Sequence, residues 1–272
     1  MPFTATVIST QDWGARPPRN RAARTNPKYI VIHHTASQNP PNHASKGTEE
    51  GAKKYARGIQ KFHMDVNGWS DSGHNFLNTT AGILLEGRHG TLDAVKQGKC
   101  VQSAHAAKAP GKLAGGNKSP GIENEGTFMT HKMGAKQWDS LVELCVALCQ
   151  SCNISPANIK GHRDFSFTLC PGDWLYAQLP KLRKEVANKL GTDSDNLSND
   201  DGEGITRDLE FGSQGLDVVR LQKKLAEKGF DPGDIDGIFG DNTRAAVIAF
   251  QRAMTLLDDG IVGPQTRAAL GF

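Results

Sequence analysis

An acidic segment with almost no bulky apolar side chains divides this chain of 272 residues. Residues 191–205 contain five acidic residues, no Lys or Arg, and only Leu197 and Ile205 as sizeable apolar side chains. Such a segment buries too little surface to offset the entropy lost on ordering. We therefore predict a flexible linker over 191–205, between a larger domain over 1–190 and a smaller domain over 206–272. Two domains are also what this length suggests.

The formal charge differs between these parts. It is +10 for residues 1–190, −5 for 191–205 and −2 for 206–272. The basic domain shows no recognisable nucleic-acid motif, so we expect no nucleic-acid partner. Attraction to anionic cell-envelope polymers is one use of the charge, and a merely solvated basic surface is the alternative.

Apolar runs in the chain are short. None approaches the ~20 residues of a membrane helix, so we expect no stable membrane insertion. The first 24 residues lack an apolar stretch behind a basic start, which predicts no secretory signal peptide. The five cysteines, an odd number in a chain of this size, predict a mostly reduced protein. Cys145 and Cys149 share one face of an amphipathic segment, where we expect them to be buried.

Two segments end in residues that bind metals. The apolar run Tyr29–Ile32 is typical of a buried strand and leads into His33 and His34. His162 precedes Cys170 by eight residues and offers an imidazole beside a thiolate. Two histidines and one cysteine leave one position open on a tetrahedral zinc ion, as a catalytic site requires.

Hydrophobic periodicity predicts a mixed α/β fold for the larger domain, with helices packed on a central sheet. The strand-like runs are 29–33, 74–78, 82–85 and 121–123, and the helical patterns are 48–63, 135–152 and 174–189.

The smaller domain contains an internal repeat, in which residues 236–247 and 259–270 match at an offset of 23 positions. Each copy reads as a turn that leads into a helix, and Gly263 followed by Pro264 suits a helix start. A preceding helix over about 215–229 completes the pattern. We predict a small all-α module of three helices around one core.

The larger domain resembles the family of zinc-dependent N-acetylmuramoyl-L-alanine amidases that includes phage endolysins and animal peptidoglycan recognition proteins. The resemblance rests on segments that follow the family's order: IVIHHT (30–35), IQKFHMDVNGWSDSGHNFL (59–77), LEGR (85–88), SAHA (103–106), GIENEG (121–126) and GHRDFSFTLCPGDWLY (161–176). The smaller domain resembles the peptidoglycan-binding module of many wall hydrolases, through its LQ, DGIFG and AFQ segments.

The resemblance implies one Zn²⁺ per chain, with His33, His162 and Cys170 as its ligands. It also implies that Glu123 is the general base, although Glu125 could compete for that role. His74 stands where many relatives have a catalytic tyrosine, and it could donate to an oxyanion or carry a proton.

Other residues in these segments have implied roles around the substrate. Thr168 matches a threonine whose hydroxyl could donate to the developing oxyanion. His105 matches a groove histidine that holds substrate rather than metal. We also place His34 and Asn124 among the substrate-binding residues.

The resemblance implies a zinc hydrolase that cleaves the amide between N-acetylmuramic acid and L-alanine in bacterial peptidoglycan. The alternatives are a non-catalytic peptidoglycan-recognition protein on the same fold and a zinc peptidase acting within the stem peptide. We expect a monomeric phage or prophage endolysin, made in the cytoplasm and released to the cell wall, with an exported autolysin or toxin as the alternative.

Overall fold

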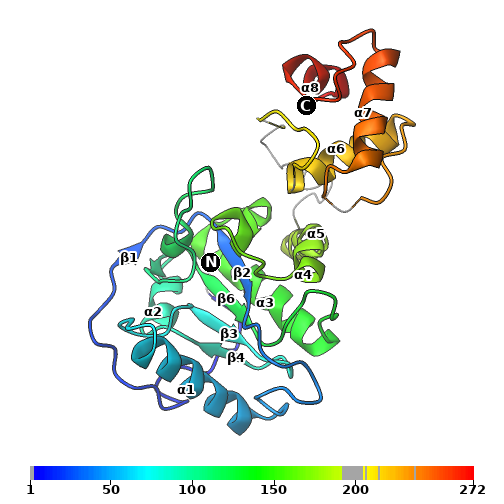
Figure 1. The fold of residues 1–272 in the computed structure, drawn as a ribbon. Coiled ribbons are helices and arrows are strands. Elements are labelled where there is room, and N and C mark those ends of the chain that lie inside the picture. The colour runs from blue at the N-terminus through cyan, green and yellow to red at the C-terminus, as the bar shows by residue number, and fades with distance from the viewer. Residues whose placement is uncertain (1–2, 192–204, 206, 214, 236) are drawn as a thin grey trace. The chain divides into compact units, whose positions relative to one another are not determined.

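The computed structural model describes residues 3–191, 205, 207–213, 215–235 and 237–272 (Figure 1). The chain forms two compact units, Met1–Asn199 and Asp200–Phe272, and each has its own apolar core. The predicted linker lies outside the described residues except at its ends, so its flexibility and the domain boundaries stay predictions. No helix in the described ranges combines the length and the apolar character needed to cross a membrane.

A five-stranded mixed sheet lies at the centre of the larger unit. In spatial order its strands are β4 (Leu84–Glu86), β3 (Phe76–Asn78), β6 (Gly121–Asn124), β2 (Ile30–His34) and β7 (Ile159–Gly161). All neighbours pair in parallel except β3 and β4, which are antiparallel. A separate antiparallel pair joins β1 (Arg24–Thr25) to β5 (Cys100–Val101). The predicted mixed α/β fold is confirmed.

Helices connect and cover these strands. They are α1 (Glu49–Asp65), α2 (Thr91–Val95), α3 (Ala135–Cys152), α4 (Asp173–Ala177) and α5 (Leu179–Leu190), with 3₁₀ turns η1 (Gly116–Lys118), η2 (Pro156–Asn158) and η3 (His162–Asp164). The pattern over 174–189 predicted one helix but belongs to two. Pro180 lies in the first turn of α5, where its missing N–H leaves no gap in the helical bonding, whereas it would break a continuous helix.

The alternation of side chains assigns each face of the sheet to a different core. Ile32 and Ile122 pack in the cluster that includes α3 and α5, whereas Leu77 packs with residues of α1. Figure 1 shows α1 and α3 on opposite sides of the sheet. His33 and Leu77 are both paired in register with Glu123, so these three side chains share the α1 side. This is the side on which chemistry-bearing residues collect.

The cysteines outside the predicted metal ligands lie in the interior. Cys145, Cys149 and Cys152 belong to α3, and Cys100 belongs to β5. All four are buried, and all five cysteines of the chain are free. The predicted burial of Cys145 and Cys149 is confirmed.

The smaller unit consists of α6 (Leu216–Glu227), α7 (Asp241–Ala253) and α8 (Pro264–Leu270) around one core. Its repeated turns are held in the same way. Gln222 accepts the Gly237 N–H at 2.9 Å and donates to Thr243 Oγ1 at 3.1 Å, and Gln251 makes the equivalent bonds to Gly260 and Thr266 at 2.9 and 3.1 Å. The predicted three-helix module is confirmed.

Candidate metal centre

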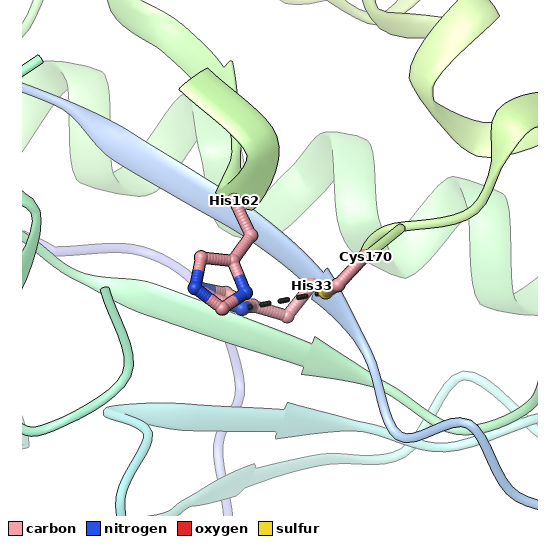
Figure 2. Close-up of side chains that lie close together, drawn as sticks. All are labelled: His33, His162 and Cys170. Atoms are coloured by element: carbon pink, nitrogen blue, oxygen red, sulfur yellow. Dashed lines mark hydrogen bonds between the residues drawn. The ribbon is translucent and has the colours of Figure 1, made fainter. Parts of the chain in front are cut away.

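Three predicted metal ligands meet at one end of the sheet. His33 lies near the end of β2, and His162 follows directly after β7, which pairs in parallel with β2. Cys170 approaches from the loop before α4, and Figure 2 shows it beside His33 and His162. One ligand atom from each of the three lies within 4.8 Å of the others. Residues up to 137 positions apart therefore form one compact set of donors.

The spacing of these donors suits a zinc ion. His33 Nδ1 lies 3.6 Å from Cys170 Sγ. A nitrogen at about 2.0 Å and a sulfur at about 2.3 Å from a tetrahedral zinc would be about 3.5 Å apart. The donor set of two imidazoles and one thiol is also one that zinc prefers, and it leaves a fourth position for water or substrate.

Backbone groups surround the Cys170 side chain. The His34 N–H donates to Sγ at 3.4 Å, and the Cys170 N–H donates to Thr168 Oγ1 at 3.1 Å. Burial raises the pKa of the thiol above its ordinary value. Without a cation the site therefore holds a thiol, and a bound cation would favour the thiolate.

Arg163 ties the Cys170 loop to the turn that carries His162. Its Nη2 donates to the Leu169 carbonyl at 2.5 Å, and its Nη1 bonds Asp173 at 2.8 Å. Its guanidinium carbon lies 4.6 Å from the centre of the Tyr176 ring. These contacts span the loop on both sides of Cys170. Arg163 was not among the predicted site residues, although its position directly after His162 was a signal for it.

Glu123 and His74 form a second group beside the donors. Glu123 Oε2 is in short contact with His74 Nδ1, and the His74 ring centre lies 4.7 Å from that of His33. Both side chains open onto a groove of about 380 Å³ that is walled by α1. The other residues lining this groove are Thr35, Tyr55, Gly58, Ile59, Phe62 and His63.

Burial governs the protonation of this group. It raises the pKa of Glu123 to about 8 and lowers that of His74 to about 3. The pKa of His162 is lowered to about 4, and that of His33 is also lowered, chiefly by burial and then by neighbouring histidines. At neutral pH the metal-free site therefore holds neutral imidazoles, whose lone pairs are available to a metal, and a neutral Glu123 carboxyl.

Comparison with known proteins is decisive for the family. Residues 23–173 match the family described as N-acetylmuramoyl-L-alanine amidase. The chain belongs to this amidase family. Residues 214–270 match a family of peptidoglycan binding domains.

Relatives of the amidase domain occur in animals and bacteria. Peptidoglycan-recognition protein SC2 of Drosophila melanogaster is 31% identical over 176 residues, which cover 64% of this chain and 84% of that protein. The N-acetylmuramoyl-L-alanine amidase CwlL of Bacillus licheniformis is 33% identical over 138 residues, which cover 47% of this chain and 38% of that protein. The structure of Drosophila PGRP-LB has 29% identity and a TM-score of 0.51, covering 65% of this chain and 93% of that chain.

Two residues predicted to bind substrate lie on the other side of the amidase sheet. His34 Nδ1 accepts the Phe128 N–H at 3.2 Å. Asn124 is fully buried, where it donates to the His33 carbonyl at 2.9 Å and accepts from Asn78 at 3.0 Å. Both side chains bond within the fold, next to residues that face the groove, and their roles toward substrate stay predictions.

Glu125, the alternative general base, is separated from the groove. Its carboxylate accepts the Ser45 N–H at 2.8 Å, the Ser45 hydroxyl at 2.6 Å and the Thr80 N–H at 3.0 Å. The side chain is fully buried. Glu125 therefore holds the loops that contain Ser45 and Thr80, whereas Glu123 lines the groove.

His105 lies next to His33. It is 5% exposed, and its Nδ1 is 2.9 Å from His33 Nε2. Its other ring nitrogen lies 3.0 Å from the Ser119 carbonyl oxygen. The amidase domain thus brings together His33, His162, Cys170, Glu123 and His74, with Thr168 and His105 in contact with the metal donors.

Proposed function

We propose that this protein is a zinc-dependent hydrolase that cleaves the amide between N-acetylmuramic acid and L-alanine in peptidoglycan. The observation that carries the proposal is the convergence of His33, His162 and Cys170 beside Glu123, which itself lines a groove. The amidase family of the chain supports the choice of bond. A single zinc ion held by the three donors would supply Lewis acidity and a nucleophile at neutral pH.

Glu123 is placed to move protons in this reaction. Its Oε2 is in short contact with His74 Nδ1, and the residue lines the groove. With a cation held by His33, His162 and Cys170, the carboxyl would ionise more readily. Glu123 would then accept a proton from the attacking water and return it to the departing amine.

We assign His74 and Thr168 supporting roles in stabilising the charge that develops at the scissile amide. The neutral His74 ring is in short contact with Glu123 through Nδ1, and the residue lines the groove. The Thr168 oxygen is occupied by the Cys170 N–H, so its own hydroxyl hydrogen remains for an oxyanion. We assign the carboxylate the main proton transfer and these two residues supporting roles.

The smaller unit would help the protein act on an insoluble substrate. We propose that it binds peptidoglycan, as its family match suggests, and raises the local concentration of the catalytic unit at the wall. We further propose a monomeric phage or prophage endolysin that is made in the cytoplasm and acts after release to the wall. The pairing of an amidase domain with a wall module favours this role.

The test combines metal analysis with product analysis. The full-length protein is loaded with zinc and incubated with purified peptidoglycan, and the products are identified by mass. We expect about one zinc per chain and stem peptides with a free L-alanine amino group. Cys170→Ser should abolish both zinc binding and cleavage, whereas Cys152→Ser, a change at a buried thiol outside the site, should preserve both.

Other products would identify the alternatives. Cleavage within the stem peptide would show a zinc peptidase. Peptidoglycan binding without cleavage by the zinc-loaded protein would show a recognition protein. Normal turnover by Cys170→Ser would overturn the assignment of the metal ligands.

A further inference from the structure

A line of hydrogen-bonded groups leads from the protein interior to the metal donors. The Ser119 carbonyl oxygen lies 3.0 Å from His105 Nε2, and His105 Nδ1 lies 2.9 Å from His33 Nε2. The remaining nitrogen of His33, Nδ1, lies 3.6 Å from Cys170 Sγ. Each ring nitrogen of both histidines thus has one defined neighbour.

The carbonyl at one end sets the direction of every bond in this line. A carbonyl oxygen only accepts, so His105 Nε2 carries the hydrogen. A ring that carries its hydrogen on Nε2 keeps a lone pair on Nδ1, so His105 Nδ1 is the acceptor toward His33. His33 Nε2 must then be the donor, and His33 Nδ1 keeps a free lone pair toward Cys170.

His105 is held firmly in this position. A Cβ at Gly121 would come within 2.5 Å of the His105 ring, so the backbone of β6 packs directly against it. The carbonyl partner is fixed as well, because Ser119 accepts from the Lys28 and Tyr29 N–H groups and donates to the Gly115 carbonyl through its hydroxyl. Both ring nitrogens of His105 are used within the protein.

We propose that His105 is a positioning residue that sets the proton and the orientation of His33 so that His33 Nδ1 is presented to the metal. This inference rests on the proposed metal centre. It gives His105 a role through another residue, in place of the substrate contact expected from the sequence. Removal of a residue that hydrogen-bonds a metal-binding histidine lowers metal affinity by roughly 10- to 100-fold.

The experiment compares two substitutions in the full-length protein. His105→Leu removes the acceptor, whereas His105→Asn keeps an oxygen near the position of Nδ1. Zinc affinity is measured by competition with a chelator. We expect His105→Leu to lower the affinity by roughly 10- to 100-fold and His105→Asn to restore most of it. The control is His89→Leu, because His89 bonds Asp71 and should not affect zinc affinity.

Two outcomes would contradict the inference. Unchanged zinc affinity in His105→Leu, with a higher KM for soluble muropeptide, would return His105 to substrate binding. Equal losses in the Leu and Asn variants would show that only packing matters.

A measurement on the unsubstituted protein covers the case in which His105→Leu does not fold. Nitrogen NMR of the metal-free protein should show the His33 proton on Nε2, and a proton on Nδ1 would overturn the inference. The zinc-affinity and NMR readouts do not require amide cleavage. A protein that binds zinc in this way without cleaving peptidoglycan would refute the proposed function and leave the role of His105 intact.

Discussion

Glu123 and Glu125 are two positions apart, yet the structure predicts opposite consequences when each is changed to glutamine. The Glu125 carboxylate receives three donors in a fully buried site. A glutamine there offers one oxygen and one NH₂, so at least one donor would face another donor. An orphaned buried donor costs about 1–3 kcal/mol, and the remaining bonds weaken when the charge is lost. We expect Glu125→Gln to lower the free energy of unfolding by about 2–5 kcal/mol.

Glu123→Gln should not lower stability, and near neutral pH it should raise it, because the amide is buried in neutral form without taking up a proton. The buried Glu123 carboxyl is neutral in the metal-free protein, because its pKa is raised to about 8, and it contacts His74 Nδ1. An amide N–H can replace the carboxyl O–H in that contact. The amide cannot accept the proton of the reaction, so kcat should fall roughly 10²- to 10⁴-fold, or about 3–5 kcal/mol in activation free energy.

The assay is a pair of measurements on each variant. Urea unfolding gives stability, and turnover of a soluble muropeptide by the zinc-loaded protein gives kcat. The reasoning would be refuted if Glu125→Gln lost turnover while keeping its stability. It would equally fail if Glu123→Gln were nearly silent and His74→Ala were the crippling change, because the proton would then pass through the imidazole.

Three further results are expected. Deletion of 191–272 should preserve turnover of soluble muropeptide and reduce lysis of whole walls, and loss of both would mean that the module contributes to the active site. Arg163→Ala should weaken zinc binding, as measured by chelator competition, and Arg163→Lys should have a smaller effect. Equal zinc affinity in the unsubstituted protein and both variants would show that Arg163 does not hold the Cys170 loop in place for the metal. The metal-free protein should be most stable near neutral pH, as measured by urea unfolding across pH. The raised pKa of Glu123 removes stability as the pH rises toward about 8, and the lowered pKa values of His33 and His162 remove it as the pH falls below about 6.5. Glu123→Gln should flatten the alkaline side of that profile, and an unchanged slope would contradict the assignment.

The sequence predicted the elements whose hydrophobic pattern is long or continuous. The pattern over 135–152 coincides with α3, and the apolar run before His33 corresponds closely to β2. β1, β5 and β7 are too short to show alternation and were not predicted. β3 and β4 are also short, but they overlap the predicted runs 74–78 and 82–85.

Site residues that lie in distinctive sequence motifs could be predicted. Contacts that depend on how distant segments pack together could not. The donor set could be proposed because His33, His162 and Cys170 lie in distinctive local segments. The contact between His105 and His33 joins residues 72 positions apart and depends on how the strands pair. Simple alternation suggested that Glu125 could share the side of Glu123, but β6 ends at Asn124, and the Glu125 side chain turns to Ser45 and Thr80.

The burial of the thiols determines how readily the cysteines of this protein react. Burial raises the pKa of Cys100, Cys145 and Cys152, and it raises that of Cys149 to about 12. Since the thiolate is the reactive form, these four side chains resist alkylation and mispairing at neutral pH without any disulfide to protect them. Cys170, the proposed ligand, would be shielded by its metal. No cysteine of the folded protein therefore forms a thiolate readily at neutral pH, because burial raises the pKa of the metal-free Cys170 thiol as well.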